Sequence, residues 1–125
     1  MICFDTNIII YLANGTLSEE IISDKPIFYP SIVYIETLGY PRLLSAEELR
    51  IKELFHTMTE LPLTENIISL ATHLKQLRNI SLADSIVAAT ALEHNLELWT
   101  ANTKDFKNVD NLRLNNPLSN HSDLG

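Results

Sequence analysis

Cysteine and glycine are both scarce in this 125-residue chain, which has one cysteine and three glycines. A lone Cys3 cannot form an internal disulfide, and together with four scattered histidines it offers no zinc-ligand spacing. The few glycines form no phosphate-cradling loop, and the chain has no Gly-x-Ser-x-Gly motif. These absences argue against a disulfide-rich secreted domain, a zinc site, a P-loop and a serine hydrolase. We expect Cys3 to be a small buried hydrophobe in a reducing cytosol.

Long apolar runs are missing as well. The short run at 8–10 follows no basic segment, and no stretch approaches the length that spans a membrane. The expectation is therefore a cytoplasmic protein without membrane association. A hydrophobic fraction of 46% over 125 residues suffices for one domain with a real core.

Positive charge is in short supply, since nine Lys and Arg stand against sixteen Asp and Glu, for a net charge of −7. Taken alone, this balance argues against a polyanionic partner such as nucleic acid. The excess is uneven, because residues 1–74 have a net charge of −6 and residues 75–125 a net charge of −1. The second half is the better candidate to face a phosphate backbone, although an acidic surface also simply keeps a small protein soluble.

The order of elements is typical of an α/β domain on a mainly parallel sheet. Apolar segments predict strands at 1–4, 26–30, 96–100 and 111–114. Apolar periodicity and capping residues predict helices at 7–14, 18–23, 31–39, 45–58, 64–78 and 81–95. The helices at 45–58 and 64–78 are expected to form an antiparallel pair joined through Pro62. Residues 117–125 are polar and expected to be a loose tail.

Asp5 is a residue that this architecture alone does not explain. It ends the apolar opening MICF, and a buried carboxylate without a partner is costly. Functional groups of parallel α/β sheets gather where strands end, so Asp5 and Thr100 should face one crevice. Three more acids stand out: Glu36 in SIVYIETLG, a helix expected to be mostly buried, Asp84 among the small residues of SLADSIVAATAL, and Asp105 just past a strand in TANTKDF.

Four converging carboxylates would repel one another strongly without a cation between them. All-oxygen ligands select hard ions such as Mg²⁺ or Mn²⁺. Each acid also has a simpler interpretation. Asp5 would cap the helix that follows it, and Glu36 would face solvent. Asp84 would complete a capping box with Ser81, and Asp105 would cap its turn. From the residues alone, both interpretations stay open.

Four segments, in this order, resemble the motifs of PIN domains, specifically those of VapC-type toxins of bacterial and archaeal toxin–antitoxin modules. FDTNIIIYL is similar to the opening aspartate motif, and IVYIETLGYPRL to the glutamate helix. SLADSIVAATAL resembles the Asp-x-x-Ile/Val-Ala-Ala helix, and LWTANTKDF the closing strand and turn. The resemblance implies one PIN-like, three-layer α/β domain over residues 1–116, with a mainly parallel central sheet flanked by helices.

The same resemblance implies a metal-dependent ribonuclease with Mg²⁺, or alternatively Mn²⁺, as its cofactor. Asp5 and Asp84 would be the primary metal ligands, and Glu36 would act directly or through water. Many relatives carry a fourth acid where this chain has Asn102, and others a few residues later, so we assign that role to Asp105. All four acids are thus candidate catalytic residues and metal ligands. The expected supporting residues are Thr6, Asn7, Thr100 and Asn102.

Partners follow from the resemblance too: an RNA substrate, a cognate antitoxin protein and a second copy of the chain in a homodimer. Candidate contact residues are Ile8, Ile9, Tyr11, Leu12 and the segment 40–44, with core packing as the alternative for most of them. Three basic residues lie near the closing motif in sequence: Lys104, Lys107 and Arg113. They would either hold an RNA backbone or simply be solvated surface charges.

The segment KQLR at 75–78 is interpreted as basic residues that complement a helix C-terminus.

Two alternatives for the function stay open at this point. The chain would also fit a catalytically inactive binding module that keeps the PIN fold. A PIN nuclease outside toxin–antitoxin modules differs from the main hypothesis only in its substrate.

Overall fold

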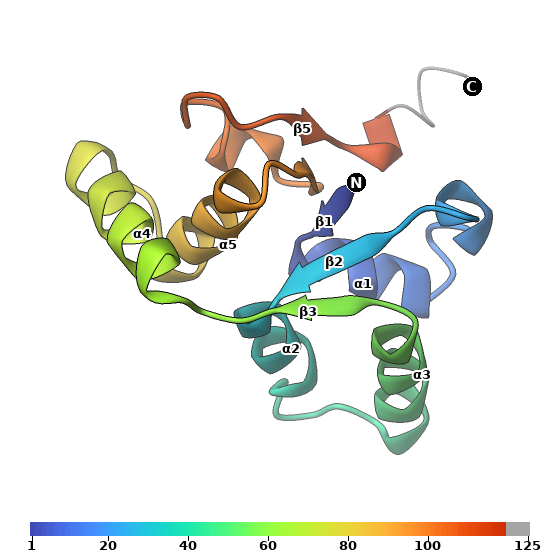
Figure 1. The fold of residues 1–125 in the computed structure, drawn as a ribbon. Helices are drawn as coiled ribbons and strands as arrows, with labels where there is room; N and C mark the ends of the chain where they lie inside the picture. Colours follow the sequence, from blue (N-terminus) through green and yellow to red (C-terminus); the bar gives the residue numbers. More distant parts are fainter. Residues whose placement is uncertain (120–125) are drawn as a thin grey trace.

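A five-stranded parallel sheet organises the computed structural model, which describes residues 1–119 (Figure 1). The strands are β1 (Ile2–Phe4), β2 (Ile27–Pro30), β3 (Thr59–Leu61), β4 (Glu97–Trp99) and β5 (Leu114–Asn115). Their order across the sheet is β3-β2-β1-β4-β5, and every neighbouring pair is parallel. The predicted α/β class with a parallel central sheet is confirmed.

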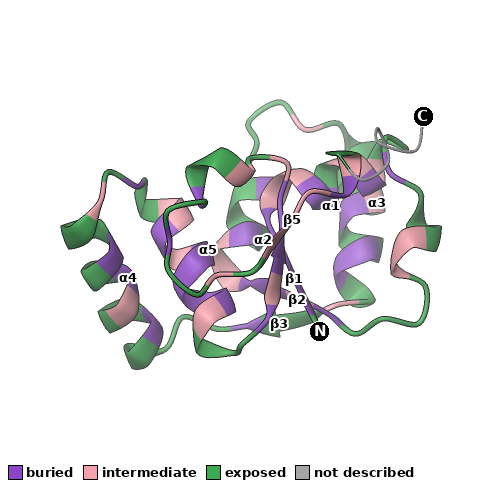
Figure 2. Cartoon of the chain, turned by 90° about the horizontal axis from the view of Figure 1, so that it is seen from above, coloured by how far each residue is buried: buried purple, intermediate pink, exposed green. Residues whose placement is uncertain are grey.

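Helices cover both faces of this sheet. They are α1 (Thr6–Ala13), α2 (Ser31–Leu38), α3 (Ser45–His56), α4 (Glu65–Leu77) and α5 (Leu82–Glu93), with the short 3₁₀ helices η1 (Glu19–Ile22) and η2 (Thr103–Asp105). Seen from above, the strands run between α4 and α5 on one side and α1 and α3 on the other (Figure 2). This is the expected three-layer arrangement.

The predicted pairing of the two middle helices is wrong. Residues 59–61 between them form β3, which pairs with β2 at the edge of the sheet. As a result α3 packs against α1, whereas α4 packs against α5, and both views place α3 and α4 far apart (Figures 1 and 2). The strand was missed because Thr59 and Glu60 are exposed and only Leu61 is buried, so the segment has no apolar run.

Small side chains bring α5 close to the sheet. Val87, Ala88, Ala89 and Ala91 are fully buried, and α5 contacts both β2 and β4. Close packing of this kind leaves little room for larger residues. It fixes the start of α5, and with it Asp84, relative to the ends of the strands.

The inner face of α1 belongs to the core rather than to a partner surface. Ile8 and Ile9 are fully buried and Leu12 is 2% exposed, so core packing is the correct interpretation for these three residues. Tyr11 is half-buried, and Ile10, which was not among the expected contact residues, is 41% exposed. In the described part of the chain, no helix is long and apolar enough to cross a membrane.

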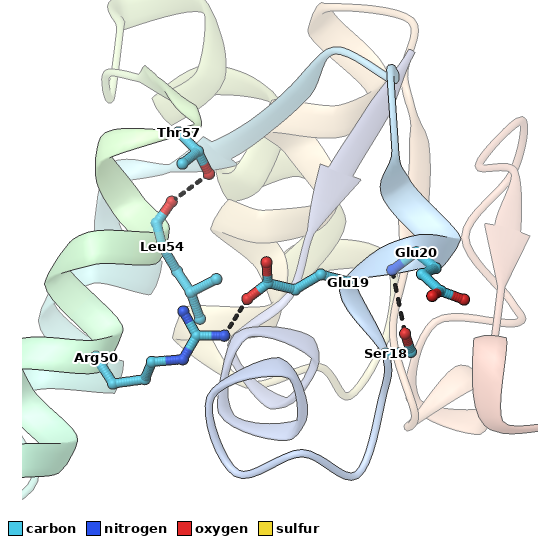
Figure 3. A network of polar contacts seen from close by, with 6 residues as sticks. All are labelled: Ser18, Glu19, Glu20, Arg50, Leu54 and Thr57. Carbon is cyan, nitrogen blue, oxygen red and sulfur yellow. Dashed lines mark hydrogen bonds and ion pairs between the residues drawn. The ribbon is translucent and has the colours of Figure 1, made fainter.

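An ion pair connects η1, in the segment between α1 and β2, to helix α3. Arg50 on α3 pairs with Glu19 of η1, which links the connection between α1 and β2 to the helix layer (Figure 3). The hydroxyl of Ser18 caps η1 by accepting from the Glu20 amide at 3.2 Å. The Thr57 hydroxyl closes α3 by donating to a backbone carbonyl at 2.7 Å.

The C-terminal segment differs in detail from the expectation. The last strand is β5 at 114–115 rather than 111–114. Residues 117–119 are helical, Pro117 is buried, and the Leu118 amide donates to Asn116 Oδ1 at 3.0 Å. The remainder of the expected tail, 120–125, lies outside the described residues.

The sheet changes its direction of growth at β1. The chain adds β2 and β3 on one side of β1 and β4 and β5 on the other. In open parallel sheets, this switch point creates a crevice at the carboxyl ends of the central strands. Phe4 pairs with Trp99 in the β1–β4 register, so the next residues, Asp5 and Thr100, meet at that crevice.

Candidate active site

Asp5 lies at the switch point and is only 5% exposed. As the N-cap of α1, it accepts a hydrogen bond on Oδ1 from the Thr6 amide at 2.8 Å. Oδ2 accepts from the Thr100 hydroxyl at 2.8 Å, across 95 residues of sequence, and from Asn7 Nδ2 at 3.4 Å. The capping interpretation is therefore correct but incomplete, because a cap needs no donor from the end of β4.

The supporting residues form a clamp around this carboxylate. Asn7 Oδ1 accepts from the Ala101 amide at 3.0 Å, and Asn7 Nδ2 lies 3.5 Å from the Thr100 hydroxyl. The same hydroxyl accepts from the Asn102 amide at 3.1 Å. Asn102 thus contributes through its backbone, while its side chain is exposed. These bonds hold the loop after β4 against the start of α1.

Glu36 reaches the same place from α2. Its Oε1 accepts a hydrogen bond from the Thr6 hydroxyl at 3.1 Å. The helix is less buried than the sequence predicted, because Glu36 is exposed and its neighbour Ile35 is 67% exposed. The contact with Thr6 nevertheless places Glu36 next to Asp5, so Glu36 does more than face solvent.

Asp84 lies in the first turn of α5 and is half-buried. The Ser81 hydroxyl caps this helix by accepting from the Asp84 amide at 3.1 Å. Among the described residues, the return bond from the Ser81 amide to the Asp84 carboxylate, which a full capping box requires, is absent. Burial raises the pKa of Asp84, and a hydrogen bond from the Ser81 side chain to its carboxyl lowers that pKa in part. The capping interpretation is therefore correct for Ser81 and does not exclude a second role for the half-buried carboxylate.

Asp105 ends η2 and is exposed. It lines a cleft of about 700 Å³ together with Asp84, at the junction of α4, α5 and η2. On the other side of the site, Glu36 lines an apolar groove of about 360 Å³ between α1, α2 and α3. The four predicted acids thus extend from the groove, past Asp5, to the cleft.

Burial and the charges of neighbouring acids raise the pKa values of Asp5 and Asp84. Burial is the main cause that raises the pKa of Asp5, hydrogen bonds from Thr100 and the Thr6 amide oppose it, and the charge of Glu36 raises it further. Burial likewise raises the pKa of Asp84, and the charges of Asp5 and Asp105 add to the increase. We call Glu36, Asp5, Asp84 and Asp105 the acidic row.

Cys3, one residue before the end of β1, takes no part in this chemistry. It is fully buried, and burial together with the charge of Asp5 raises the pKa of its thiol far above the ordinary value. A thiol held in its protonated form is a poor nucleophile and metal ligand. Cys3 is the small core hydrophobe that was expected.

The acidic row has the chemistry of a hard-cation site. Within residues 1–119 the ion pairs are Arg50–Glu19 and Lys52–Glu48, so no acid of the row takes part in an ion pair there. Its donors are all oxygens, which suit Mg²⁺ or Mn²⁺. No three His, Cys, Asp or Glu side chains of the described chain form a ready-made metal-ligand cluster. Mg²⁺ needs none, because it keeps several waters and binds through one or two carboxylates.

The raised pKa values predict how the stability of the metal-free protein depends on pH. Folded Asp5 and Asp84 retain protons at pH values where the unfolded chain has lost them, so the free energy of unfolding falls as pH rises above the ordinary Asp pKa of 3.8. Asp5→Asn removes one of these groups. In EDTA, the melting temperature of the variant minus that of wild type should increase as pH rises from about 4 to about 7.

Asp24→Asn is the matched control for this measurement, because Asp24 is exposed and precedes β2, at the amino ends of the strands and away from the carboxyl ends where Asp5 lies. Its difference from wild type should not grow in the same way. A constant difference between Asp5→Asn and wild type across this pH range would contradict the raised pKa of Asp5.

Sequence reasoning missed two basic residues near the row. Lys75 and Arg78, which were interpreted as helix C-terminal charges, line the cleft beside Asp84 and Asp105. Of the three basic residues expected there, only Lys104 lines it. The others do not: Lys107 is exposed elsewhere, and Arg113 donates to the Asn95 carbonyl at 2.9 Å, before β4. The available signal was a basic KQLR cluster in an acidic chain, six residues before Asp84.

Comparisons with known proteins agree with this geometry. The PIN domain family model matches residues 2–112. A toxin–antitoxin complex from Klebsiella pneumoniae is 29% identical over 94% of this chain and 98% of that chain, with a TM-score of 0.78. VapBC-1 from nontypeable Haemophilus influenzae is 27% identical over 93% of this chain and 98% of that chain, with a TM-score of 0.74.

VapBC2 from Rickettsia felis, solved with a DNA fragment from its promoter, has a TM-score of 0.76 over 93% of this chain and 98% of that chain. At 24% identity it supports the fold alone. No curated protein sequence matches the chain significantly. The resemblance to VapC-type PIN domains predicted from the four motifs is confirmed, and the matched segment contains the whole acidic row. The chain belongs to the PIN domain family.

Proposed function

We propose that this protein is a metal-dependent endoribonuclease and the toxin of a toxin–antitoxin module. Its family and its likeness to toxin–antitoxin structures imply a nuclease. The observation that carries the finer proposal is the acidic row, which extends from the groove at Glu36, past Asp5, to the cleft at Asp84 and Asp105, and whose acids form no ion pair in the described chain. Such a row repels RNA when empty and attracts phosphate once a divalent cation is bound.

Asp5 and Asp84 are the groups we assign to hold the cation. Asp5 is fixed by hydrogen bonds from Thr6, Asn7 and Thr100, as expected for a ligand that outer groups orient. The position of Asp84 is fixed by the N-cap at Ser81 and by the close packing of α5. When bound, a divalent ion activates water for attack and neutralises charge that develops at the phosphate. Asp105, exposed beside Asp84, would complete the site from η2.

Glu36 is the better candidate for the general base. Hydrogen-bond donors already contact both oxygens of Asp5, whereas Glu36 is exposed and, among the described residues, accepts from the Thr6 hydroxyl alone. In the proposed reaction, Glu36 takes a proton from the attacking water as the new P–O bond forms. The P–O bond to the leaving strand breaks, and that oxygen takes up a proton. The products are one strand with a terminal phosphate and one with a terminal hydroxyl.

The apolar groove beside Glu36 is the site we assign to the antitoxin. Ile10, Tyr40 and Leu43 line it, and Tyr40 is 66% exposed. Part of the expected segment 40–44 therefore lines the proposed partner surface, with Ile10 in place of the buried residues of α1. A segment bound there would lie against one end of the acidic row, and would block access to it in the cytoplasm. The likeness to a toxin–antitoxin complex from Klebsiella pneumoniae supports an antitoxin as the partner, and the choice of this groove rests on its exposed apolar lining.

A second apolar surface suits the homodimer. Ile35, Leu63 and Leu82 are 67%, 47% and 64% exposed, and apolar hollows lie between them. Exposed apolar clusters of this kind mark interaction surfaces. Because this surface is separate from the groove at Glu36, one chain would accommodate an antitoxin and a second copy together.

RNA cleavage with and without metal is the experiment that tests the proposed function. Purified, antitoxin-free protein should cut a structured RNA in Mg²⁺, and EDTA should abolish cleavage until Mg²⁺ is restored. At each cut, one fragment should carry a terminal phosphate and the other a terminal hydroxyl, as hydrolysis predicts. A folded protein that binds Mg²⁺ but cuts no RNA would favour the inactive binding module. Cleavage that continues unchanged in EDTA would overturn the metal-dependent mechanism.

A further inference from the structure

The cleft beside Asp84 collects much of the positive charge of an acidic protein. Of nine Lys and Arg in the chain, three line this cleft of about 700 Å³: Lys75, Arg78 and Lys104. They come from α4, from the connection between α4 and α5, and from η2. Segments far apart in sequence have therefore brought three positive charges into a cleft that also holds the carboxylates of Asp84 and Asp105, and the surplus of positive charge favours an anionic ligand.

None of the three forms an ion pair within the part of the chain that the structure describes. Lys75 Nζ donates to the Ile80 carbonyl at 2.8 Å, which anchors the side chain and leaves its charge uncompensated. Arg78 is half-buried, and its Nε is buried without a hydrogen-bond partner among residues 1–119. A buried guanidinium donor without a partner is unusual, and a turn of the side chain toward the cleft would let this donor meet an acceptor there.

We propose that Lys75, Arg78 and Lys104 form a phosphate-binding wall that holds the RNA backbone next to the scissile phosphate. The inference rests on the proposed nuclease function and adds the path of the substrate. Arg78 offers a planar, multidentate donor set that matches phosphate, whereas the two lysines act as point charges. Asp84 and Asp105 line the same cleft, so a strand held on the wall passes directly over that end of the acidic row.

The wall also explains how a protein with a net charge of −7 binds a polyanion. Contacts to phosphates depend on local charge and not on net charge, and they are independent of sequence. The cation and the wall would bind different phosphates. The cation would bind the phosphate that reacts, and the wall would bind the adjacent phosphates of the same strand. Affinity for RNA should then survive, in part, when the cation is removed.

Binding and kinetics of charge variants test this proposal. The probe is a fluorescein-labelled, single-stranded 12-nucleotide RNA, measured by anisotropy in EDTA so that it stays intact. We expect Lys75→Gln, Arg78→Gln and Lys104→Gln each to raise the Kd about threefold to tenfold. Each should also reduce the slope of log K against log salt by about 0.7. Arg78→Lys should restore part of the affinity, because it keeps the charge but not the planar donor set.

Lys52→Gln is the matched control, since Lys52 lies on α3 and pairs with Glu48 at 3.6 Å. It removes the same charge and should leave the Kd for RNA nearly unchanged. In Mg²⁺, the lysine variants of the wall should raise KM for cleavage and leave kcat within about twofold. Melting temperatures establish that each variant is folded.

The outcomes separate this inference from the proposed function. If wild type binds the RNA and the wall variants lose affinity, but no RNA is cut in Mg²⁺, the wall stands and the nuclease proposal fails. If RNA is cut but folded wall variants bind and cleave like wild type, the wall is wrong and the nuclease stands. If Lys52→Gln loses as much affinity as the wall variants, the change in net charge alone would explain the loss. The proposal that the three residues form a binding site would then be wrong.

Discussion

Asp5→Asn should lower the rate of Mg²⁺-dependent RNA cleavage by at least about 1000-fold. That loss exceeds the roughly 10- to 100-fold typical of groups that only orient a ligand, because Asp5 is assigned to hold the cation itself. Asparagine has nearly the same shape and is also a good N-cap, so α1 should form as before. The variant should therefore stay folded and lose the rise in melting temperature that Mg²⁺ gives wild type.

Two measurements check this prediction: single-turnover cleavage rates, and thermal unfolding over a range of Mg²⁺ concentrations. Asp24→Asn again serves as control, because it removes one carboxylate near the amino ends of the strands, away from Asp5. It should cleave RNA and respond to Mg²⁺ like wild type. Wild-type cleavage by a folded Asp5→Asn variant would show that Asp5 is only a helix cap, and the proposed mechanism would be wrong.

Asp84→Asn and Asp105→Asn should separate the two acids that line the cleft. We expect Asp84→Asn to reduce cleavage by more than about 100-fold, and Asp105→Asn by roughly 10-fold. The physical reason is their surroundings. Asp84 is half-buried at the start of a tightly packed helix, whereas Asp105 is exposed on η2, where water can replace it more easily as a ligand.

Metal affinity is the second readout for this pair, because it distinguishes loss of a ligand from loss of RNA contact. Asp84→Asn should weaken the Mg²⁺-induced stabilisation much more than Asp105→Asn does. Asn102→Asp, which places an acid where many relatives carry one, should compensate at least in part for the loss of Asp105. Equal effects of both substitutions would mean that η2 holds the cation as firmly as α5 does. The ranking by burial would then be wrong.

Local patterns were sufficient to predict most of the elements. An apolar opening that stops at an acid predicted β1, and capping residues with apolar periodicity predicted α2, α4 and α5 within a residue or two. β3 escaped this reasoning because it is an edge strand of three residues with one buried side chain. Its existence depends on the exposed edge of β2, which no local pattern reveals. The wrong pairing of α3 and α4 followed from that one missing strand.

The acidic residues were predicted individually, but their relationships depend on tertiary structure. Asp5 and Thr100 were expected to meet because parallel strands end at a common edge, and their 2.8 Å hydrogen bond agrees with that expectation. The contact between Thr6 and Glu36 and the exposure of α2 were not predictable, because apolar neighbours such as Ile35 belong to a surface instead of the core. Whether the four acids together bind a metal remains a prediction.

The sequence by itself determined the α/β class, the candidate acids and the family resemblance, because each depends on residue type and short-range order. Tertiary structure alone decided which charges are neighbours. Lys75 and Arg78 complement a helix end when viewed locally, and only the packing of α4 against α5 places them opposite Asp84. Coulomb interactions depend on distance in space and on burial. A linear pattern specifies neither, so the electrostatics of the site emerged only from the folded chain.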